Sequence, residues 1–324
     1  MKDWHTREDR IETKLAARYY RKLFPLLKAL KGTVLNHRYC IRWPYDIGGQ
    51  GILLIADDLS QAREVLIKFA ALPYHRPADI SLVDIQHSRR FIEKEAELLK
   101  MFQGTLLPEL YDFFYASNPL HAQERGSEIT LTEPYFVMEL LNGCSLDTHV
   151  RQLRSEKPVD YGVIERWLVL TLEEIMQFFT MLFDNGFLYT DPQPANIFVC
   201  EGSERCIRIV DAGSIVAVEP MEPPIFPFSE VYLSPENYQR FTTDKLSYPD
   251  QQFVIYALGK ALFGVATNRE PIPGEDPNFG EEILQSYSVP FVHLLHGMIE
   301  KQYESFKSVY QAENLLKEVI NYSL

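Results

Sequence analysis

The sequence predicts an α+β protein with two lobes, a small β-rich N-terminal lobe and a larger, mostly helical C-terminal lobe. Short apolar runs around a glycine turn fill residues 38–70, which is typical of strands. From about residue 160 the pattern becomes mostly helical. The change falls near residues 138–146, so we expect residues 36–141 to form the first lobe and residues 142–324 the second.

The composition is globular and the charge is acidic. Of the 324 residues, 46% are hydrophobic and 24% are charged, which permits a sizeable core. The formal net charge of −13 argues against nucleic acid as the main partner, because neutralising phosphates requires clustered lysine and arginine.

The cysteines and the apolar segments indicate a cytoplasmic protein. Four scattered cysteines contain no CxxC pair, which favours a reducing compartment. The N-terminus lacks the apolar core of a secretory signal. The longest apolar stretch, residues 253–266, is interrupted by Lys260 and is too short to span a bilayer, so we expect no membrane span.

Residues 1–35 precede the first lobe and are expected to be a helical extension packed on it. Ile11, Leu15, Tyr19 and Leu23 recur at helical spacing. Residues 1–31 hold nine lysines and arginines against four acidic residues, so a docking element for an acidic partner or a membrane surface is the alternative.

The first lobe is predicted to contain three successive strands, a helix and a further strand. Two strands flank the glycine turn within residues 38–58, and a third ends in the run Val65-Leu-Ile-Lys68-Phe. Residues 89–102 are predicted to form the helix, and residues 135–141 the strand that follows a polar loop. In the second lobe, a short β-like pair at residues 197–210 interrupts the helices.

The glycine turn, Asp46-Ile-Gly48-Gly-Gln-Gly51-Ile-Leu53, has two interpretations. Glycines between strands let backbone N–H groups approach phosphate oxygens without a Cβ in the way. A tight hairpin turn explains the same residues, and the turn alone does not decide between them.

Lys68 lies on an apolar strand, where an ammonium needs a partner because desolvation is costly. Glu95 lies on the apolar stripe of the helix at residues 89–102, while Glu93 and Glu97 project elsewhere. The pattern predicts an internal Lys68–Glu95 ion pair. The alternative is that Lys68 extends to solvent at the end of its strand.

The most specific motif joins three polar residues. Asp191 is followed by Asn196 five residues later, and Asp211 comes fifteen residues after Asn196, beyond a predicted short hairpin. Each aspartate alone could be a turn or cap residue. Together they supply what phosphoryl transfer needs, a carboxylate that accepts or orients a hydroxyl proton and oxygen ligands for magnesium.

With these motifs in this order, residues 36–320 resemble the protein kinase family, and bacterial Ser/Thr kinases of the eukaryotic type in particular. The resemblance continues through Asp211-Ala-Gly213, through Leu233-Ser-Pro-Glu236, which is similar to an Ala-Pro-Glu signature, and through the central-helix run Ile255-Tyr-Ala-Leu-Gly259. It implies the two-lobed protein kinase fold.

The resemblance also implies an ATP–Mg²⁺ site. Lys68 would contact the α- and β-phosphates and pair with Glu95, and Asp191 would be the catalytic base or hydroxyl-orienting group. Asn196 and Asp211 would ligate Mg²⁺.

The same resemblance assigns residues around the nucleotide. Gly48 and Gly51 would belong to the phosphate loop. The remaining positions concern the adenine, with Leu53 and Leu66 above it, Phe198 below, Met138 at the back, and the backbone of Glu139–Leu141 as the hydrogen-bonding edge.

Several residues depart from the family pattern. Asp46 stands where the first glycine is expected, and Leu66 replaces an alanine that would face the adenine. Tyr189 and Thr190 replace the His-Arg pair before the catalytic aspartate. Gln193 replaces a lysine, which removes a positive charge from the transferring phosphoryl group.

Two further departures concern the packing of the second lobe. Ala212 replaces the usual phenylalanine after Asp211. Val254 stands where the central helix normally carries an aspartate, with Asp250 one turn earlier. With the arginine before Asp191 also absent, we expect activity to be independent of phosphorylation of the segment between Asp211 and Glu236.

Three functions are therefore weighed. The first is an ATP-dependent phosphotransferase acting on Ser or Thr hydroxyls of a protein substrate. The second is a pseudokinase that regulates a partner protein, which the departures favour. The third is a small-molecule kinase, which a deep acidic pocket beside Asp191 would favour.

Overall fold

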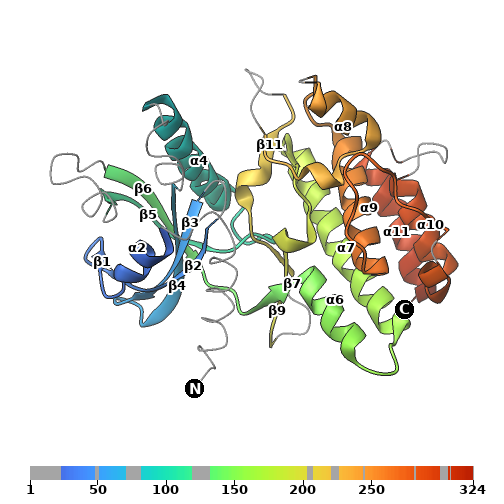
Figure 1. Cartoon of the computed structure of the whole chain (residues 1–324), viewed down its shortest axis with the longest axis horizontal. Helices are drawn as coiled ribbons and strands as arrows, with labels where there is room; N and C mark the ends of the chain where they lie inside the picture. The colour runs from blue at the N-terminus through green and yellow to red at the C-terminus, as the bar shows by residue number, and fades with distance from the viewer. Residues whose placement is uncertain are drawn as a thin grey trace. The chain divides into compact units, whose positions relative to one another are not determined.

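The computed structural model of the chain describes residues 23–47, 51–70, 82–118, 132–202, 207–219, 226–243, 245–280, 282–299, 306 and 308–323 (Figure 1). The chain forms two compact units. The first comprises Met1–Gly104 and Pro108–Leu141, and the second comprises Asn142–Leu324 with Thr105–Leu107. The first unit is rich in strands and the second is mostly helical, which confirms the predicted α+β fold class.

The first unit is built on an antiparallel sheet of six strands, in the order β1-β2-β3-β4-β6-β5. The strands are β1 (Val34–Leu35), β2 (Tyr39–Ile47), β3 (Gly51–Asp58), β4 (Arg63–Ala70), β5 (Leu110–Ser117) and β6 (Thr132–Glu139). Helix α2 (Leu23–Ala29) precedes the sheet, and α4 (Leu82–Met101) follows β4. Helix α4 thus begins seven residues before the predicted start at residue 89.

The two faces of this sheet carry different residues, because successive side chains of a strand point to opposite sides. Val65, Ile67 and Phe69 of β4 belong to the apolar core that also contains Leu27 of α2. Lys68, which alternates with them, lies on the opposite face. Helix α4 contacts β4 and β6, and Figure 1 shows it beside the sheet.

Helix α2 lies within the predicted extension at residues 1–35. Leu23, Leu27 and Leu30 are buried in the core of the sheet. Residues 1–22 lie outside the described residues, so the structure describes only the last part of that extension.

The second unit contains six helices within the described residues, and short strands and 3₁₀ turns connect them. The helices are α6 (Leu146–Ser155), α7 (Tyr161–Asp184), α8 (Pro235–Thr242), α9 (Gln251–Thr267), α10 (Val289–Ile299) and α11 (Val309–Ser323). The strands are β7 (Gly143–Ser145), β8 (Phe187–Tyr189), β9 (Ile197–Cys200), β10 (Ile207–Ile209) and β11 (Ile215–Ala217). The 3₁₀ turns are η1 (Pro194–Asn196), η2 (Ala212–Ser214), η3 (Glu230–Tyr232) and η4 (Glu282–Ser286).

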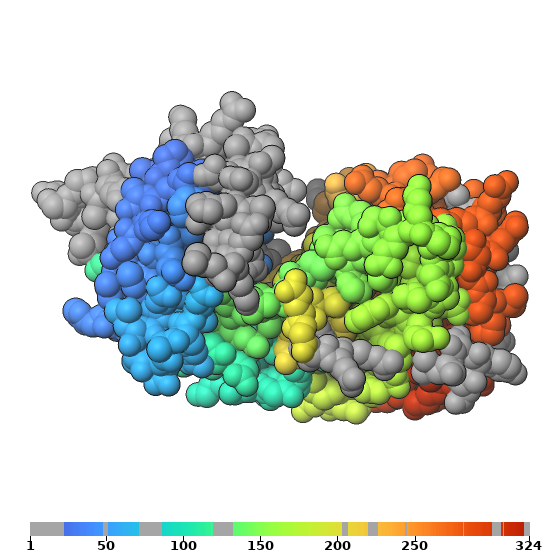
Figure 2. Space-filling model, turned by 90° about the horizontal axis from the view of Figure 1, so that it is seen from below, coloured from blue at the N-terminus to red at the C-terminus, as the bar shows by residue number. Residues whose placement is uncertain are grey.

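Helix α9 is the central helix of this unit. All of its residues from Phe253 to Thr267 are buried, and it contacts α6, α7, α10 and α11. In the space-filling view, the green surface of α6 and α7 borders the orange surface of the region around α9 (Figure 2). Among the described residues, no helix has the length and hydropathy that crossing a bilayer requires.

Two small sheets hold the polar motif of the second unit. Strand β8 pairs with β11, and β9 pairs with both β7 and β10. Asp191 and Asn196 therefore lie in the connection from β8 to β9, and Asp211 lies between β10 and β11. The predicted hairpin at residues 197–210 corresponds to β9 and β10.

Candidate functional site

The first unit brings Lys68 and Glu95 together. The Nζ of Lys68 donates to both carboxylate oxygens of Glu95, at 2.8 Å to Oε1 and 2.6 Å to Oε2. Both residues are buried, Lys68 with 8% and Glu95 with 2% of its surface exposed. Strand β4 and helix α4 thus hold the lysine by an internal ion pair, and the ammonium does not extend to solvent.

Gly51 lies at the start of β3, close to the Lys68 side chain. A Cβ at this position would lie 2.7 Å from Cε of Lys68 and 3.2 Å from the carbonyl oxygen of Phe69. A side chain at this position would therefore require the end of the Lys68 side chain to shift. Gly48 lies outside the described residues.

The residues predicted to enclose the adenine in this unit share the sheet face of Lys68. In the antiparallel register Leu53 is the cross-strand partner of Lys68, and Leu66 is that of Met138, so the side chains of each pair point to the same face. Leu66 and Met138 are buried, with 6% and 4% exposure, and Leu53 is half-buried. A leucine in place of alanine therefore fills part of this face.

The backbone of residues 139–141 was predicted to hydrogen-bond the adenine, and part of it is already engaged within the first unit. The N–H of Glu139 donates to the carbonyl oxygen of Glu109 at 2.9 Å. Leu141, the last residue of the unit, is buried. Any edge for an adenine would therefore depend on backbone atoms of residues 139–141 other than the N–H of Glu139.

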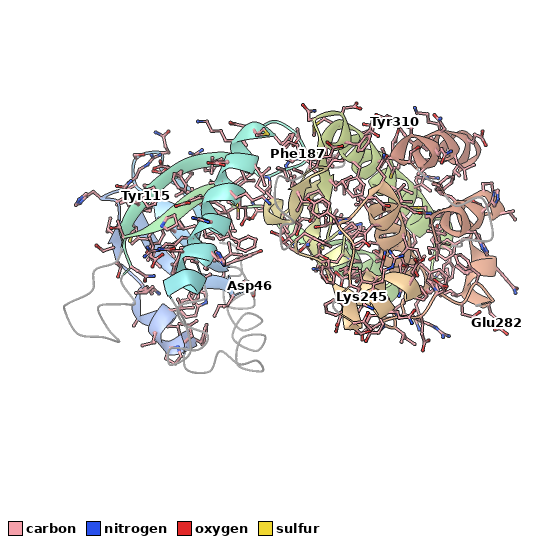
Figure 3. All side chains as sticks on the ribbon, turned by 90° about the horizontal axis from the view of Figure 1, so that it is seen from above. Asp46, Tyr115, Phe187, Lys245, Glu282 and Tyr310 are labelled. Atoms are coloured by element: carbon pink, nitrogen blue, oxygen red, sulfur yellow. The ribbon has the colours of Figure 1, made fainter. Side chains whose placement is uncertain are left out.

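Asp46, labelled in Figure 3, lies near the end of β2. Its Oδ1 accepts a hydrogen bond from the N–H of Ile47 at 2.9 Å. The carboxylate that replaces the first glycine of the family pattern is thus engaged by its own strand.

In the second unit, the carboxylate of Asp191 is held by two side-chain amides. Its Oδ2 accepts from Nε2 of Gln193 at 2.7 Å and from Nδ2 of Asn196 at 3.2 Å. The same Nδ2 also donates to the backbone oxygen of Asp191 at 3.0 Å. Gln193 therefore keeps a hydrogen bond to the carboxylate but brings no charge.

Burial and charge act together on Asp191, which has 7% of its surface exposed. Desolvation raises the pKa of its carboxyl group, and the nearby charge of Asp211 raises it further. The polar side chains of Ser229, Gln193 and Asn196 oppose the rise by stabilising the carboxylate. A carboxylate with a raised pKa is a better proton acceptor than an exposed aspartate.

Asp211 and Asn196, the predicted magnesium ligands, each carry a side-chain oxygen of the kind that a divalent cation binds. The Nδ2 of Asn196 is directed at Asp191, which leaves its amide oxygen as the atom that could ligate. One oxygen of Asp211, Oδ2, accepts from Oγ of Ser214 at 2.8 Å. Carboxylate and amide oxygens are the ligands that Mg²⁺ prefers.

Phe198, the predicted lower contact of the adenine, lies on β9 and is buried. Its position depends on Gly143 of β7, where φ is +151°. A Cβ on Gly143 would lie 2.0 Å from the carbonyl oxygen of Val199 and 2.9 Å from Cε1 of Phe198. Only glycine allows β7 and β9 to approach this closely.

Thr190 replaces the arginine of the family pattern and connects backbone segments. Its Oγ1 lies 3.0 Å from the carbonyl oxygen of Ser214 and 2.5 Å from that of Pro227. Its own N–H also donates to Ser214 O at 2.9 Å. A neutral hydroxyl thus ties the loop of Asp191 to the segment that follows Asp211.

Position 254 of the central helix α9 is a valine, so this position offers no carboxylate to the Asp191 loop. Val254 is buried, and Asp250 accepts from the N–H of Phe253 at 2.8 Å as the N-cap of α9. The aspartate one turn before position 254 is therefore a helix cap.

The sequence patterns did not predict one hydroxyl contact of the site. The Oγ of Ser214 donates to Oδ2 of Asp211 at 2.8 Å. Ser229 also lies close enough to Asp191 to lower the pKa of its carboxyl group. The placement of both serines depends on how the segment after Asp211 folds back, which no local pattern predicts.

A model of the protein kinase domain family matches residues 80–323 of this chain. The match covers more than half of the chain, so the chain belongs to the protein kinase domain family. The match begins after β4, and the Lys68 strand and the glycine turn thus precede it.

Curated relatives are bacterial and archaeal kinases. Serine/threonine-protein kinase PknB of Mycobacterium tuberculosis is 24% identical over 248 residues, which cover 75% of this chain and 34% of that protein. Serine/threonine-protein kinase pkn2 of Myxococcus xanthus is 25% identical over 265 residues, 79% of this chain and 28% of that protein. Serine/threonine-protein kinase ArnS of Sulfolobus acidocaldarius is 23% identical over 231 residues, 65% of this chain and 35% of that protein. The chain thus matches about a third of the length of these relatives.

Proposed function

We propose that this protein is an ATP-dependent phosphotransferase that transfers the γ-phosphoryl group of Mg–ATP to Ser or Thr hydroxyls of a protein substrate. Membership of the protein kinase domain family and the names of the relatives support this reaction class. The observation that carries the proposal is the buried Asp191 carboxylate, whose Oδ2 is oriented by Gln193 and Asn196.

The residues of each unit have distinct roles in this proposal. In the first unit, Lys68 binds phosphate oxygens, and Glu95 keeps its ammonium oriented. In the second unit, Asp191 orients the substrate hydroxyl and accepts its proton as the bond from that oxygen to the γ-phosphorus forms and the bond to ADP breaks. Asn196 and Asp211 would hold Mg²⁺, which would supply positive charge beside the phosphate oxygens.

The remaining nucleotide contacts belong to the same proposal. Leu53, Leu66 and Met138 share one sheet face in the first unit and would enclose the adenine from above. Phe198 would contact it from below, and backbone atoms of residues 139–141 would supply the polar edge. Gly48 and Gly51 would border the phosphates.

The proposal is tested by phosphoryl transfer from labelled Mg–ATP to the protein itself and to dephosphorylated casein. Wild type, Asp191→Asn and Asp211→Asn are compared at equal concentration. Transfer is expected in wild type, and each variant should lose it by a factor of about 10²–10⁴ or more, because one removes the proton acceptor and the other a metal ligand. Wild type without transfer, or variants with undiminished transfer, would refute the proposal.

A regulatory protein without catalysis is the second candidate, and Gln193 favours it. Its neutral amide leaves the transferring phosphoryl group without the usual nearby charge. In that case Mg–ATP would stabilise the wild-type protein, by about 2.7 kcal/mol at a hundred times its Kd, and no label would be transferred.

A small-molecule kinase is less consistent with the cavity beside the Asp191 loop. This cavity of about 500 Å³ is lined by Gln193, Pro194 and Ala195, and its charged lining residues have both signs. They are Asp147, Glu270, Arg151, Arg154 and Arg269. A mixed lining suits a peptide better than the acidic pocket that a cationic small substrate requires.

A further inference from the structure

Lys260 lies in the middle of the central helix α9, with 1% of its surface exposed. Its Nζ donates to two backbone carbonyl oxygens, that of Ile272 at 2.9 Å and that of Leu233 at 3.2 Å. A buried ammonium is costly unless hydrogen bonds compensate it. Through these two hydrogen bonds Lys260 stabilises the positions of Leu233 and Ile272 against the helix.

The ammonium remains charged at neutral pH. Burial lowers the pKa of Lys260 to about 8, and the charges of Asp276 and Glu275 oppose that shift. Asp276 also accepts from the hydroxyl of Tyr256 at 2.7 Å, which fixes its carboxylate near the helix. A charged donor binds a carbonyl oxygen more strongly than a neutral one.

The two carbonyl groups belong to two loops of the second unit that line one cavity. Leu233 follows η3, whose residues Val231 and Tyr232 line the cavity of about 500 Å³ beside Gln193. Ile272 follows directly on residues 269–271, which line another part of the same cavity. One ammonium thus connects both walls to the helix behind them.

The glutamate of the Ser234-Pro-Glu236 motif lies partly at the surface. The Glu236 side chain is 46% exposed and pairs with Arg240 on the same helix at 2.6 Å. Lys260 reaches the same segment from the inside, at Leu233, one residue before the N-cap Ser234 of α8.

We propose that Lys260 is a positioning residue for the protein substrate, because it sets the separation of the η3 wall and the 269–272 wall of the cavity beside the Asp191 loop. The inference rests on the proposed function, since it assigns that cavity to the substrate. The residue touches neither nucleotide nor reacting atoms, so it acts on substrate binding rather than on the chemical step.

The test compares wild type, Lys260→Met, Lys260→Gln and the control Lys245→Met. Lys245, labelled in Figure 3, is an exposed lysine of the same unit, so its replacement makes the same chemical change without touching α9. Hydrogen–deuterium exchange is measured for residues 229–243 and 268–280, together with KM for dephosphorylated casein, KM for ATP, and kcat.

Lys260→Met should increase exchange in both segments and raise KM for casein about tenfold, which corresponds to roughly 1.4 kcal/mol of lost binding. KM for ATP should stay within twofold of wild type. Lys260→Gln keeps an N–H donor and should give a smaller change, and Lys245→Met should match wild type. If Lys260→Met does not fold, Lys260→Gln carries the same comparison.

The failure of this inference differs from the failure of the proposed function. Unchanged exchange in both segments, or unchanged KM for casein with active enzyme, refutes the role of Lys260. Wild type that transfers no phosphate refutes the proposed function, and the substrate role with it. Increased exchange in such an inactive protein would leave Lys260 as a structural residue only, which also overturns the proposal.

Discussion

At the scale of single residues, the side chains that donate to Asp191 are uncharged. Two amides, Gln193 and Asn196, orient its carboxylate. In the proposed reaction, neither amide can neutralise negative charge that develops on a phosphoryl group. The proposed catalysis and the regulatory alternative therefore differ most directly at Gln193.

The first prediction concerns Gln193. Gln193→Lys should raise kcat about tenfold, because it places a positive charge near the transferring phosphoryl group, where a single preorganised donor is worth up to 10²–10³. Gln193→Met, which loses the donor to Asp191, should lower kcat. Both are measured by steady-state transfer to casein, and a Gln193→Lys variant no faster than wild type would contradict the prediction.

The second prediction follows from the raised pKa of Asp191. Between its unfolded and folded pKa values the folded state binds more protons, so stability falls as the pH rises through that window and stays lower above it. At pH 7 the buried carboxylate therefore destabilises the fold. Asp191→Asn should raise Tm at pH 7, and the gain should shrink as the pH falls toward 3.8, the ordinary aspartate value.

Thermal melts of wild type and Asp191→Asn at pH 7 and pH 4 check this sign. A lower Tm of the variant at pH 7, or a gain that grows on acidification, would show that hydrogen bonds outweigh burial at this carboxylate.

At the scale of elements, α9 organises the second unit through its capped N-terminus and its buried centre. Asp250 caps its first turn, Val254 replaces a carboxylate in its interior, and Lys260 bonds two loops from its middle. The helix therefore positions the site by packing and by a lysine, without an ion pair from position 254 to the Asp191 loop.

The third prediction separates the cap from catalysis. Asp250→Ala should lower the free energy of unfolding by about 1 kcal/mol, because it removes the acceptor for the N–H of Phe253. The kcat should be unchanged at a temperature where both proteins are folded. Urea unfolding and casein phosphorylation measure the two effects, and Asp250→Ser, which keeps a capping oxygen, is the matched control. A fall in kcat without loss of stability would instead indicate contact with the catalytic loop.

At the scale of the molecule, the hydroxyl groups between Asp211 and Glu236 lie at defined places in the second unit. Ser214 donates to Asp211, and Ser234 caps α8 by accepting from Asn237 N at 3.2 Å. Ser229 lies close enough to Asp191 to lower the pKa of its carboxyl group. The phenol of Tyr232 lines the cavity beside Gln193. Each hydroxyl of the segment thus already has a structural position.

The fourth prediction is that phosphorylation of this segment does not control activity. Thr190 has no charge to pair with a phosphate, and phosphate on Ser214 or Ser229 would lie beside an aspartate. Phosphotransfer should be equal before and after phosphatase treatment, measured on protein whose phosphorylation state is verified by mass spectrometry. A large drop after treatment would contradict the prediction.

The sequence by itself determined the α+β class, the succession of β2, β3, β4, α4 and β6, and the proximity of Lys68 to Glu95, but it did not predict β1 or β5. The fold class follows from local periodicity, and the Lys68–Glu95 pair follows from the cost of burying an unpaired charge. The spacing of Asp191, Asn196 and Asp211 likewise indicated one site, because short strands must return between them.

Only the tertiary structure decided which partners the remaining polar residues have. It made Asp250 a helix cap, directed Ser214 to Asp211, and placed the ammonium of Lys260 on carbonyl groups of two loops. Periodicity tells which face of an element is buried, but it does not tell which distant loop covers that face. In the sequence Lys260 only interrupts an apolar run, and packing is what gives it its two acceptors.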